Sequence, residues 1–224
     1  MELKELFLVI QNSTDYREDP DGSELNWKYL RDDENKMLFI LVQETKTKKD
    51  WLYNFLFIPR IYKYYGQRVI VHSGWYKLAR KLATFILYDM YYGELKPYTD
   101  YQIVFTGWSA GAAVAQLAGT IVQSRFYYPN LDEMMKHGKH DLTGQLQFVG
   151  YGQPAFCFGK KSVERLKAPY FGFINFLYEK DPIRFVVPFC SRFTNGTIKP
   201  EKDPKTWDEK HRVYGKSKLK PSEV

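Results

Sequence analysis

The residues with the clearest chemical potential form the pentapeptide Gly107-Trp108-Ser109-Ala110-Gly111. A β-branched and aromatic run precedes it and an alanine-rich stretch follows it, which predicts a strand, a tight turn and a helix. In such a turn, called a nucleophile elbow, the serine hydroxyl stands out from the sheet above the positive end of the helix. The flanking glycines are needed because the strand and helix backbones approach too closely for a Cβ atom. The pattern indicates a nucleophilic Ser109, and the alternative is an ordinary strand-to-helix turn that carries a serine.

A serine hydroxyl is a weak nucleophile at neutral pH, so Ser109 needs a histidine to accept its proton and a carboxylate to orient that histidine. If acid and base follow the serine in the chain, as in α/β-hydrolases, His72 is excluded and His137, His140 and His211 remain. His137 and His140 lie in a polar segment ahead of the last two predicted strands. His211 is therefore the predicted base.

The predicted acid is Asp181, because it follows the apolar run Phe173–Tyr178, which suits a central strand. A carboxylate on the loop after such a strand can reach a histidine on the following loop. Three later acids lie in a stretch rich in Lys and Glu that is typical of solvated surface: Asp203, Asp208 and Glu209. The alternative for Asp181 is a plain turn residue before Pro182.

The elements expected around these residues alternate between strands and helices. The sequence predicts a hairpin over 25–43, a strand at 69–71, a helix from Trp75 to Gly93, strands at 103–105, 146–150 and 173–178, and a helix after Ser109. Strands separated by helices imply a mostly parallel central sheet with helices on both faces and functional groups at the carboxyl ends of its strands. With 224 residues and no linker or repeat, residues 1–224 are expected to form a single domain.

Composition limits the partners and the location of the protein. The first apolar run, Phe7–Ile10, is too short for a signal peptide or a membrane span, so a cytoplasmic location without a transmembrane segment is expected. The net charge of +7 suggests an anionic partner, yet Lys and Arg are interleaved with acids and no nucleic-acid motif is present. We interpret this as a diffuse surface charge without a nucleic-acid partner, and attraction to anionic lipid is the next alternative.

No cofactor is expected from the sequence. The spacing His137-x-x-His140-Asp141 is a weak metal pattern, since no other cluster of ligands lies near it in the chain. Neither a phosphate-binding glycine loop nor a dinucleotide fingerprint is present. The predicted chemistry therefore depends on side chains alone.

Four segments that occur in order resemble the class 3 lipases, the fungal-type triacylglycerol lipase family of α/β-hydrolases. They are His72-Ser73-Gly74-Trp75, the Ser109 pentapeptide, Gly152-Gln153-Pro154-Ala155-Phe156 and Asp181-Pro182-Ile183-Arg184-Phe185-Val186-Val187-Pro188. The resemblance implies the α/β-hydrolase fold, with Ser109 as nucleophile, Asp181 as acid and His211 as base. It also implies an esterase or lipase that acts on acyl esters of glycerolipids.

The resemblance further implies an oxyanion hole, which needs two donors aimed at the developing negative oxygen. One donor is the amide of Ala110. In the family the other comes from an Arg-Gly-Ser/Thr segment, and Thr45 matches the Ser/Thr of that segment. Here Gln43 and Glu44 stand where Arg and Gly are usual. A glutamate beside the hole opposes negative charge on the substrate oxygen, and loss of the glycine restricts the backbone. The rival hypothesis is therefore a lipase-like binding or scaffold module with weak or lost turnover.

The family often covers its site with a helical lid that opens at a lipid surface, and Trp51–Tyr65 lies at the corresponding position. Its aromatic residues with interspersed Lys and Arg are typical of a lipid boundary. A short buried connection over the core is an equally weighted alternative. The expected partners are an acyl ester lipid substrate and, transiently, a lipid surface, and phospholipase action on anionic membranes is a further alternative.

Overall fold

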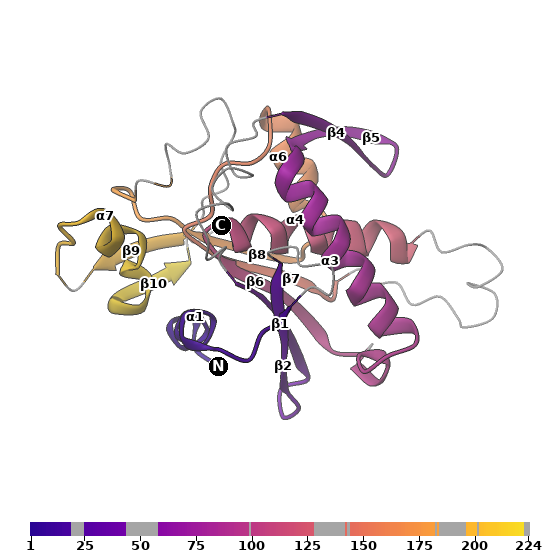
Figure 1. Ribbon diagram of the computed structural model, residues 1–224, viewed down its shortest axis with the longest axis horizontal. Coiled ribbons are helices and arrows are strands. Elements are labelled where there is room, and N and C mark those ends of the chain that lie inside the picture. The colour runs from indigo at the N-terminus through magenta and orange to yellow at the C-terminus, as the bar shows by residue number, and fades with distance from the viewer. Residues whose placement is uncertain are drawn as a thin grey trace.

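The computed structural model describes residues 1–18, 25–43, 58–98, 100–127, 142, 144–181, 183, 196–200 and 202–221. Within these residues, eight strands form one sheet in the order β1-β2-β3-β6-β7-β8-β9-β10 (Figure 1). Their bounds are Arg17–Glu18 (β1), Asn26–Asp32 (β2), Met37–Val42 (β3), Gln102–Trp108 (β6), Leu146–Tyr151 (β7), Gly172–Phe176 (β8), Gly196–Pro200 (β9) and Ser217–Pro221 (β10). The strands β3, β6, β7, β8 and β9 run parallel, and β1, β2 and β10 are antiparallel to their neighbours. The predicted mostly parallel sheet is confirmed.

Helices cover both faces of this sheet, as predicted (Figure 1). Their bounds are Leu3–Asn12 (α1), Ser73–Tyr91 (α3), Ala110–Tyr127 (α4), Lys160–Lys167 (α6) and Trp207–His211 (α7). Strand β3 shows how the two faces are divided, because Leu38 and Ile40 pack with α3 and α4 whereas Phe39 and Leu41 pack with α1. Successive side chains of a strand point to opposite faces, so an unbroken apolar run belongs to a strand that is buried on both sides.

The predicted hairpin at the start of the sheet is present. β2 and β3 pair from Trp27 opposite Val42 to Asp32 opposite Met37. The turn between them is stabilised by Asp32, whose Oδ1 accepts a hydrogen bond from the backbone N–H of Asn35 at 3.1 Å. β3 then pairs in parallel with β6, which brings the hairpin next to the strand that leads to the predicted nucleophile.

The short strand predicted at 69–71 lies in β5 (Gln67–His72), but it does not join the central sheet. It pairs with β4 (Pro59–Tyr64) in a separate hairpin that stands above α3 and beside α6 (Figure 1). β4 falls within the predicted lid Trp51–Tyr65, of which residues 51–57 lie outside the described part. The described part of that segment is mainly a strand, in which the buried Tyr62 and Tyr64 alternate with the exposed Ile61 and Lys63.

α3 begins after His72 because the side chain of this histidine caps the helix. Nδ1 of His72 accepts a hydrogen bond from the N–H of Trp75 at 3.4 Å, and the two rings stack with their centroids 4.3 Å apart. Both side chains are buried. The His-x-Gly-Trp motif therefore encodes the start of a helix, which agrees with the exclusion of His72 as the base.

The sequence did not predict α1, α6, β9 or β10. The run Phe7–Ile10 lies inside α1, where Leu6, Phe7 and Ile10 are buried against the sheet. Short amphipathic elements of this kind give a weak periodic signal. Within the described residues, no helix has the length and apolar character needed to cross a membrane.

Candidate active site

Ser109 occupies the turn between β6 and α4 with a backbone φ of +56°. This left-handed conformation costs a residue other than glycine roughly 1–2 kcal/mol, so neighbouring contacts must hold it. The Ser109 N–H donates a hydrogen bond to the carbonyl oxygen of Tyr151 at 2.9 Å, and its carbonyl oxygen accepts one from Ala112 at 3.0 Å. The serine therefore has the strained geometry predicted for a nucleophile elbow, at the carboxyl end of a central strand.

The glycines on either side of Ser109 are required by close backbone contacts. A Cβ atom on Gly107 would lie 2.6 Å from the carbonyl carbon of Gly111. A Cβ atom on Gly111 would lie 2.6 Å from the carbonyl oxygen of Val42 and 2.7 Å from that of Gln43. Real Cβ atoms essentially never come so close to backbone atoms. The sequence-based explanation of the Gly-x-Ser-x-Gly spacing is therefore confirmed, and it involves β3 as well as β6 and α4.

The start of α4 is also held by Gln153, from the Gly-Gln-Pro segment. Its Nε2 donates hydrogen bonds to the carbonyl oxygen of Ala112 at 3.1 Å and to Oε1 of Gln116 at 2.8 Å. Both glutamines are buried. A buried polar side chain needs hydrogen-bonding partners, and here these partners lie on the helix that follows the serine. Gln153 thus fixes the position of that helix relative to β7.

Asp181 is fully buried, three residues beyond Tyr178 on the loop that follows β8. Its Oδ1 accepts a hydrogen bond from the N–H of Ile183 at 2.9 Å, and its Oδ2 accepts one from the hydroxyl of Tyr214 at 2.6 Å. Hydrogen bonds to a carboxylate stabilise its ionised form. Asp181 is therefore a buried, hydrogen-bonded acid and does not have the solvent exposure of a plain turn residue.

The end of β7 connects Ser109 with Asp181. Tyr151 accepts the hydrogen bond from Ser109, and the next residue is Gly152, whose φ is +59°. A Cβ atom on Gly152 would lie 2.9 Å from the Tyr214 hydroxyl and 3.2 Å from Oδ2 of Asp181. The nucleophile and the acid therefore flank the same two residues, as expected for groups at the carboxyl ends of neighbouring parallel strands.

His211 is the last residue of α7, and its imidazole lies outside the described part of the structure. α7 begins with a capping box, in which the Thr206 hydroxyl accepts from the N–H of Glu209 and the Glu209 carboxylate accepts from the N–H of Thr206, both at 3.1 Å. Tyr214 lies three residues after His211 in sequence, so the histidine leads directly into the segment that contacts Asp181. The other two candidate bases, His137 and His140, fall outside the described residues, and the role of His211 stays a prediction.

The three acids interpreted as surface residues are at the surface. Asp203 pairs with Lys180 at 3.2 Å, and Asp208 pairs with Arg212 at 2.6 Å. Glu209 caps the start of α7. These contacts stabilise the segment that carries His211. The three acids therefore position this segment and have no role in proton transfer.

One contact that the sequence did not predict joins this segment to the elbow. The guanidinium carbon of Arg212 lies 4.6 Å from the ring centroid of Trp108, a cation–π contact. Phe7 of α1 contacts the same indole edge-on at 5.8 Å and the ring of Tyr214 at 5.5 Å. The residue before the serine and the residue after His211 are thus in contact. No motif links such distant positions, so this contact could be found only from the fold.

The predicted oxyanion donors are described only in part. Ala110 is the first residue of α4 and is buried, whereas Thr45 and Glu44 lie outside the described residues. The backbone of Gln43 lies against Gly111, and the Oε1 atom of Gln43 is buried without a hydrogen-bond partner among the described residues. Gln43, the described residue of the substituted segment, therefore lies against the elbow, and the oxyanion roles of Thr45 and Ala110 stay predictions.

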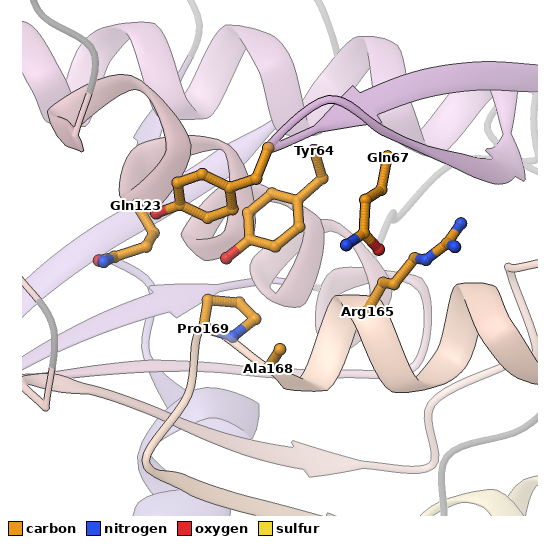
Figure 2. Close-up of a pocket in the computed structure, with 7 residues that line it drawn as sticks. Tyr64, Gln67, Gln123, Arg165, Ala168 and Pro169 are labelled. Carbon is orange, nitrogen blue, oxygen red and sulfur yellow. The ribbon is translucent and has the colours of Figure 1, made fainter.

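A pocket of about 340 Å³ lies elsewhere, between the β4–β5 hairpin and α6 (Figure 2). Its lining residues are Tyr64, Tyr65, Gln67, Gln123, Arg165, Ala168 and Pro169. None of these is a predicted catalytic residue. The pocket is therefore separate from the candidate active site.

Comparisons with known proteins agree with this arrangement. The family model for Lipase (class 3) matches residues 39–189. Phospholipase A1 PLIP2, chloroplastic, of Arabidopsis thaliana is 25% identical over 154 residues, which cover 66% of this chain and 19% of that protein. The chain therefore spans about a fifth of the length of this relative.

Solved structures are similar in fold at lower sequence identity. The native Rhizomucor miehei lipase propeptide complex has a TM-score of 0.59 at 17% identity, over 85% of this chain and 61% of that chain. A mutant form of MDLA from Penicillium cyclopium has a TM-score of 0.61 at 15% identity, over 93% of this chain and 69% of that chain. The predicted α/β-hydrolase fold is confirmed by these neighbours.

Proposed function

Because this chain belongs to the class 3 lipase family, we propose that it is a serine ester hydrolase that cleaves acyl esters of glycerolipids. The observation that carries the proposal is the backbone of Ser109, held at a φ of +56° between two glycines that tolerate no Cβ atom. A strained turn persists only where its surroundings impose it, and here it holds a buried serine at the N-terminus of α4.

In the proposed reaction His211 takes the proton from Oγ of Ser109 as this oxygen attacks the ester carbonyl carbon. Asp181 accepts the N–H of the imidazole and stabilises the imidazolium that forms. The negative oxygen of the tetrahedral intermediate is stabilised by the amide of Ala110 and by Thr45. His211 then protonates the leaving alcohol, which departs as the C–O bond breaks and leaves the acyl group on Ser109.

Water completes the proposed cycle. His211 removes a proton from a water molecule, whose oxygen attacks the carbonyl carbon of the acyl-enzyme. Collapse of the second tetrahedral intermediate releases the carboxylic acid and returns the proton to Oγ of Ser109. Asp181 keeps the imidazole oriented in both half-reactions, and its own carboxylate is held by hydrogen bonds from Ile183 and Tyr214.

The proposed substrate class is acylated glycerol, with phospholipid and triacylglycerol as its two main members. The Arabidopsis relative is a phospholipase A1, and one neighbour in fold is the Rhizomucor miehei lipase. Fatty-acid release from anionic phospholipid vesicles, compared with release from triacylglycerol emulsions, separates these two substrates.

A fluorophosphonate probe tests the proposed nucleophile, because it reacts covalently only with an activated serine. The wild type is expected to be labelled at Ser109 and to hydrolyse a short-chain p-nitrophenyl ester, and Ser109→Ala is expected to do neither. Labelling of Ser109→Ala would contradict the assignment of the nucleophile. His211→Ala is expected to lose both activities, whereas His137→Ala and His140→Ala, which change the other two candidate bases, are expected to keep them.

The second candidate function is a lipase-like binding module without turnover. It is favoured by the buried, unpaired Oε1 of Gln43 and by Glu44, which depart from the family's oxyanion segment. A folded wild type that resists the probe would support this candidate. Recovery of labelling in Gln43→Arg/Glu44→Gly would then identify the oxyanion segment as the cause.

A further inference from the structure

Two elements that lie side by side in the fold, the β4–β5 hairpin and α6, are both strongly basic. The hairpin from Ile58 to His72 contains three basic residues and no acidic residue, and α6 contains four basic residues and one acidic residue. Together the two elements have a net charge of +6. They lie about ninety positions apart in the sequence, so only the fold brings these cations together.

The hairpin and α6 form a continuous surface because they are bonded to each other. The N–H of Ile70 donates a hydrogen bond to Oγ of Ser162 at 3.2 Å, and Nη1 of Arg165 donates one to the carbonyl oxygen of Arg68 at 2.5 Å. The hairpin lies directly beside α6 (Figure 1). Their cations therefore lie on neighbouring parts of one surface.

Two isoleucines lie within this basic region and face solvent. Ile58 is 60% exposed and Ile61 is 58% exposed, although isoleucine is usually buried. Ile61 pairs with Ile70 across the hairpin, and Lys63 pairs with Arg68, so these four side chains share the outward face. We call the group formed by Ile58, Ile61, Lys63, Arg68, Lys160 and Lys161 the hairpin surface.

The cations of the hairpin surface are available to a partner. Lys63, Arg68, Lys160 and Lys161 are exposed, and none of them forms an ion pair with another residue in the described part of the chain. Apolar side chains among unpaired cations suit a bilayer boundary, where the apolar groups enter below the headgroups and the cations bind phosphates. A purely electrostatic partner such as nucleic acid gives no reason for the exposed isoleucines.

The base of the hairpin is tied to the end of the sheet that carries Ser109. The N–H of His72 donates to the carbonyl oxygen of Phe156 at 2.8 Å, and Val71 forms a β-bridge with Cys157. The segment from Gly152 to Cys157 begins beside Asp181. The base of the hairpin is therefore joined to the segment that leads away from the carboxyl end of β7.

We propose that the hairpin surface binds anionic phospholipid bilayers, with Ile58 and Ile61 inserted at the headgroup boundary and Lys63, Arg68, Lys160 and Lys161 bound to lipid phosphates. This proposal rests on the proposed function in one respect, since binding would serve to deliver lipid to Ser109. Binding itself requires no turnover, so the two proposals can fail separately.

Vesicle sedimentation of the full chain carrying Ser109→Ala tests the binding step. The vesicles are phosphatidylcholine with or without about 30% phosphatidylserine. Binding is expected to require the anionic lipid and to weaken as salt rises, since salt screens exposed charges. Lys63→Glu/Arg68→Glu is expected to weaken binding by about tenfold or more, and Ile58→Ser/Ile61→Ser by about tenfold.

Matched controls use exposed residues far from the hairpin surface. Lys199→Glu/Lys218→Glu changes the net charge by the same amount at another cross-strand pair of exposed cations, and Tyr88→Ser/Tyr92→Ser removes two exposed rings at the end of α3. Both controls are expected to stay within about twofold of the parent protein, and all variants are expected to keep its thermal unfolding midpoint. Equal losses in the controls and the hairpin variants would overturn the proposal.

Other outcomes also decide the matter. Equal binding to neutral and anionic vesicles, or no binding by the parent protein, would overturn the proposal, as would tighter binding to a DNA duplex than to anionic vesicles. If the protein binds vesicles but its serine resists fluorophosphonate, the role of the hairpin surface is supported and the proposed catalysis is refuted. If the serine reacts but the protein does not bind vesicles, the proposed catalysis is supported and the role of the hairpin surface is refuted.

Discussion

The hydroxyl of Tyr214 lies 2.6 Å from Oδ2 of Asp181 and donates a hydrogen bond to it, and both side chains are completely buried. The other carboxylate oxygen accepts from the backbone N–H of Ile183. With one donor on each oxygen, the carboxylate is fixed in rotation. Tyr214 therefore sets the orientation of the proposed acid.

Tyr214→Phe is expected to lower kcat/KM for a soluble ester by about tenfold and stability by about 1.5–3 kcal/mol, because it removes a buried hydrogen bond to a charged group. Tyr151→Phe is the matched control, since its hydroxyl is also part of the core but donates to the carbonyl oxygen of Leu3 at 2.5 Å. Ester kinetics and urea unfolding measure the two effects. An equal fall in kcat/KM for both variants would show that Tyr214 acts through general stability alone.

The strain at Ser109 predicts a difference between two inactive variants. Glycine adopts a positive φ without a steric penalty, whereas alanine does not. Ser109→Gly is therefore expected to be more stable than Ser109→Ala by about 1 kcal/mol, measured by chemical unfolding, although glycine normally destabilises a protein relative to alanine. The opposite order would mean that the turn is not strained in solution.

Close packing at Gly111 predicts a severe effect for a single methyl group. In Gly111→Ala the new Cβ atom would lie 2.6 Å from the carbonyl oxygen of Val42, and a strand backbone cannot yield without breaking its pairing. We expect a loss of about 2 kcal/mol or more together with the loss of ester hydrolysis. Gly172→Ala is the control, because its Cβ atom would meet only the Gln147 side chain, at 3.4 Å. Similar thermal midpoints for the two variants would contradict the packing at the elbow.

The sequence was sufficient for the central strands and for the elbow because these depend on local rules. Residues 103–105 are apolar enough to be buried on both faces, and the glycines around Ser109 reflect contacts between adjacent elements. The position of Asp181 was also predictable, since an acid just after a buried strand lies at the carboxyl edge of the sheet, and its role as the acid stays a prediction.

Other parts of the site could not be predicted from the sequence. The bond from Tyr214 to Asp181 joins positions 33 residues apart, and the contact between Arg212 and Trp108 spans more than a hundred. Such pairs depend on where β10 and α7 pack, and short elements have little periodicity of their own. The sequence also predicts the strand at 69–71 but not its place outside the central sheet. An apolar run does not specify which strand it pairs with.

Buried tyrosines predict a loss of stability at high pH. Burial raises the pKa of Tyr62 from its ordinary value of 10 to about 12, and burial also raises the pKa values of Tyr29 and Tyr64. As the pH rises, the unfolded chain loses these protons before the folded chain does. The contribution of Tyr62 to the free energy of unfolding is therefore complete below pH 10 and is lost as the pH rises from 10 toward 12. Unfolding in urea at several pH values in this range measures the decline. Tyr62→Phe is expected to make the decline shallower, and an unchanged slope would show that Tyr62 does not contribute to it.

The contact between Arg212 and Trp108 predicts a positioning role for a charged side chain next to the proposed base. Arg212→Lys keeps a cation but loses the planar group that lies against the indole, whereas Arg212→Ala loses both. Because α7 is only five residues long, this contact is a major constraint on where His211 lies. We expect kcat to fall by about tenfold for Arg212→Ala and by less for Arg212→Lys, with KM for a soluble ester nearly unchanged.

Asp208→Asn removes the ion-pair partner of Arg212 but leaves the ring contact, so it separates the two interactions. If Asp208→Asn lowers kcat as much as Arg212→Ala, the ion pair orients the segment and the stacking on Trp108 does not.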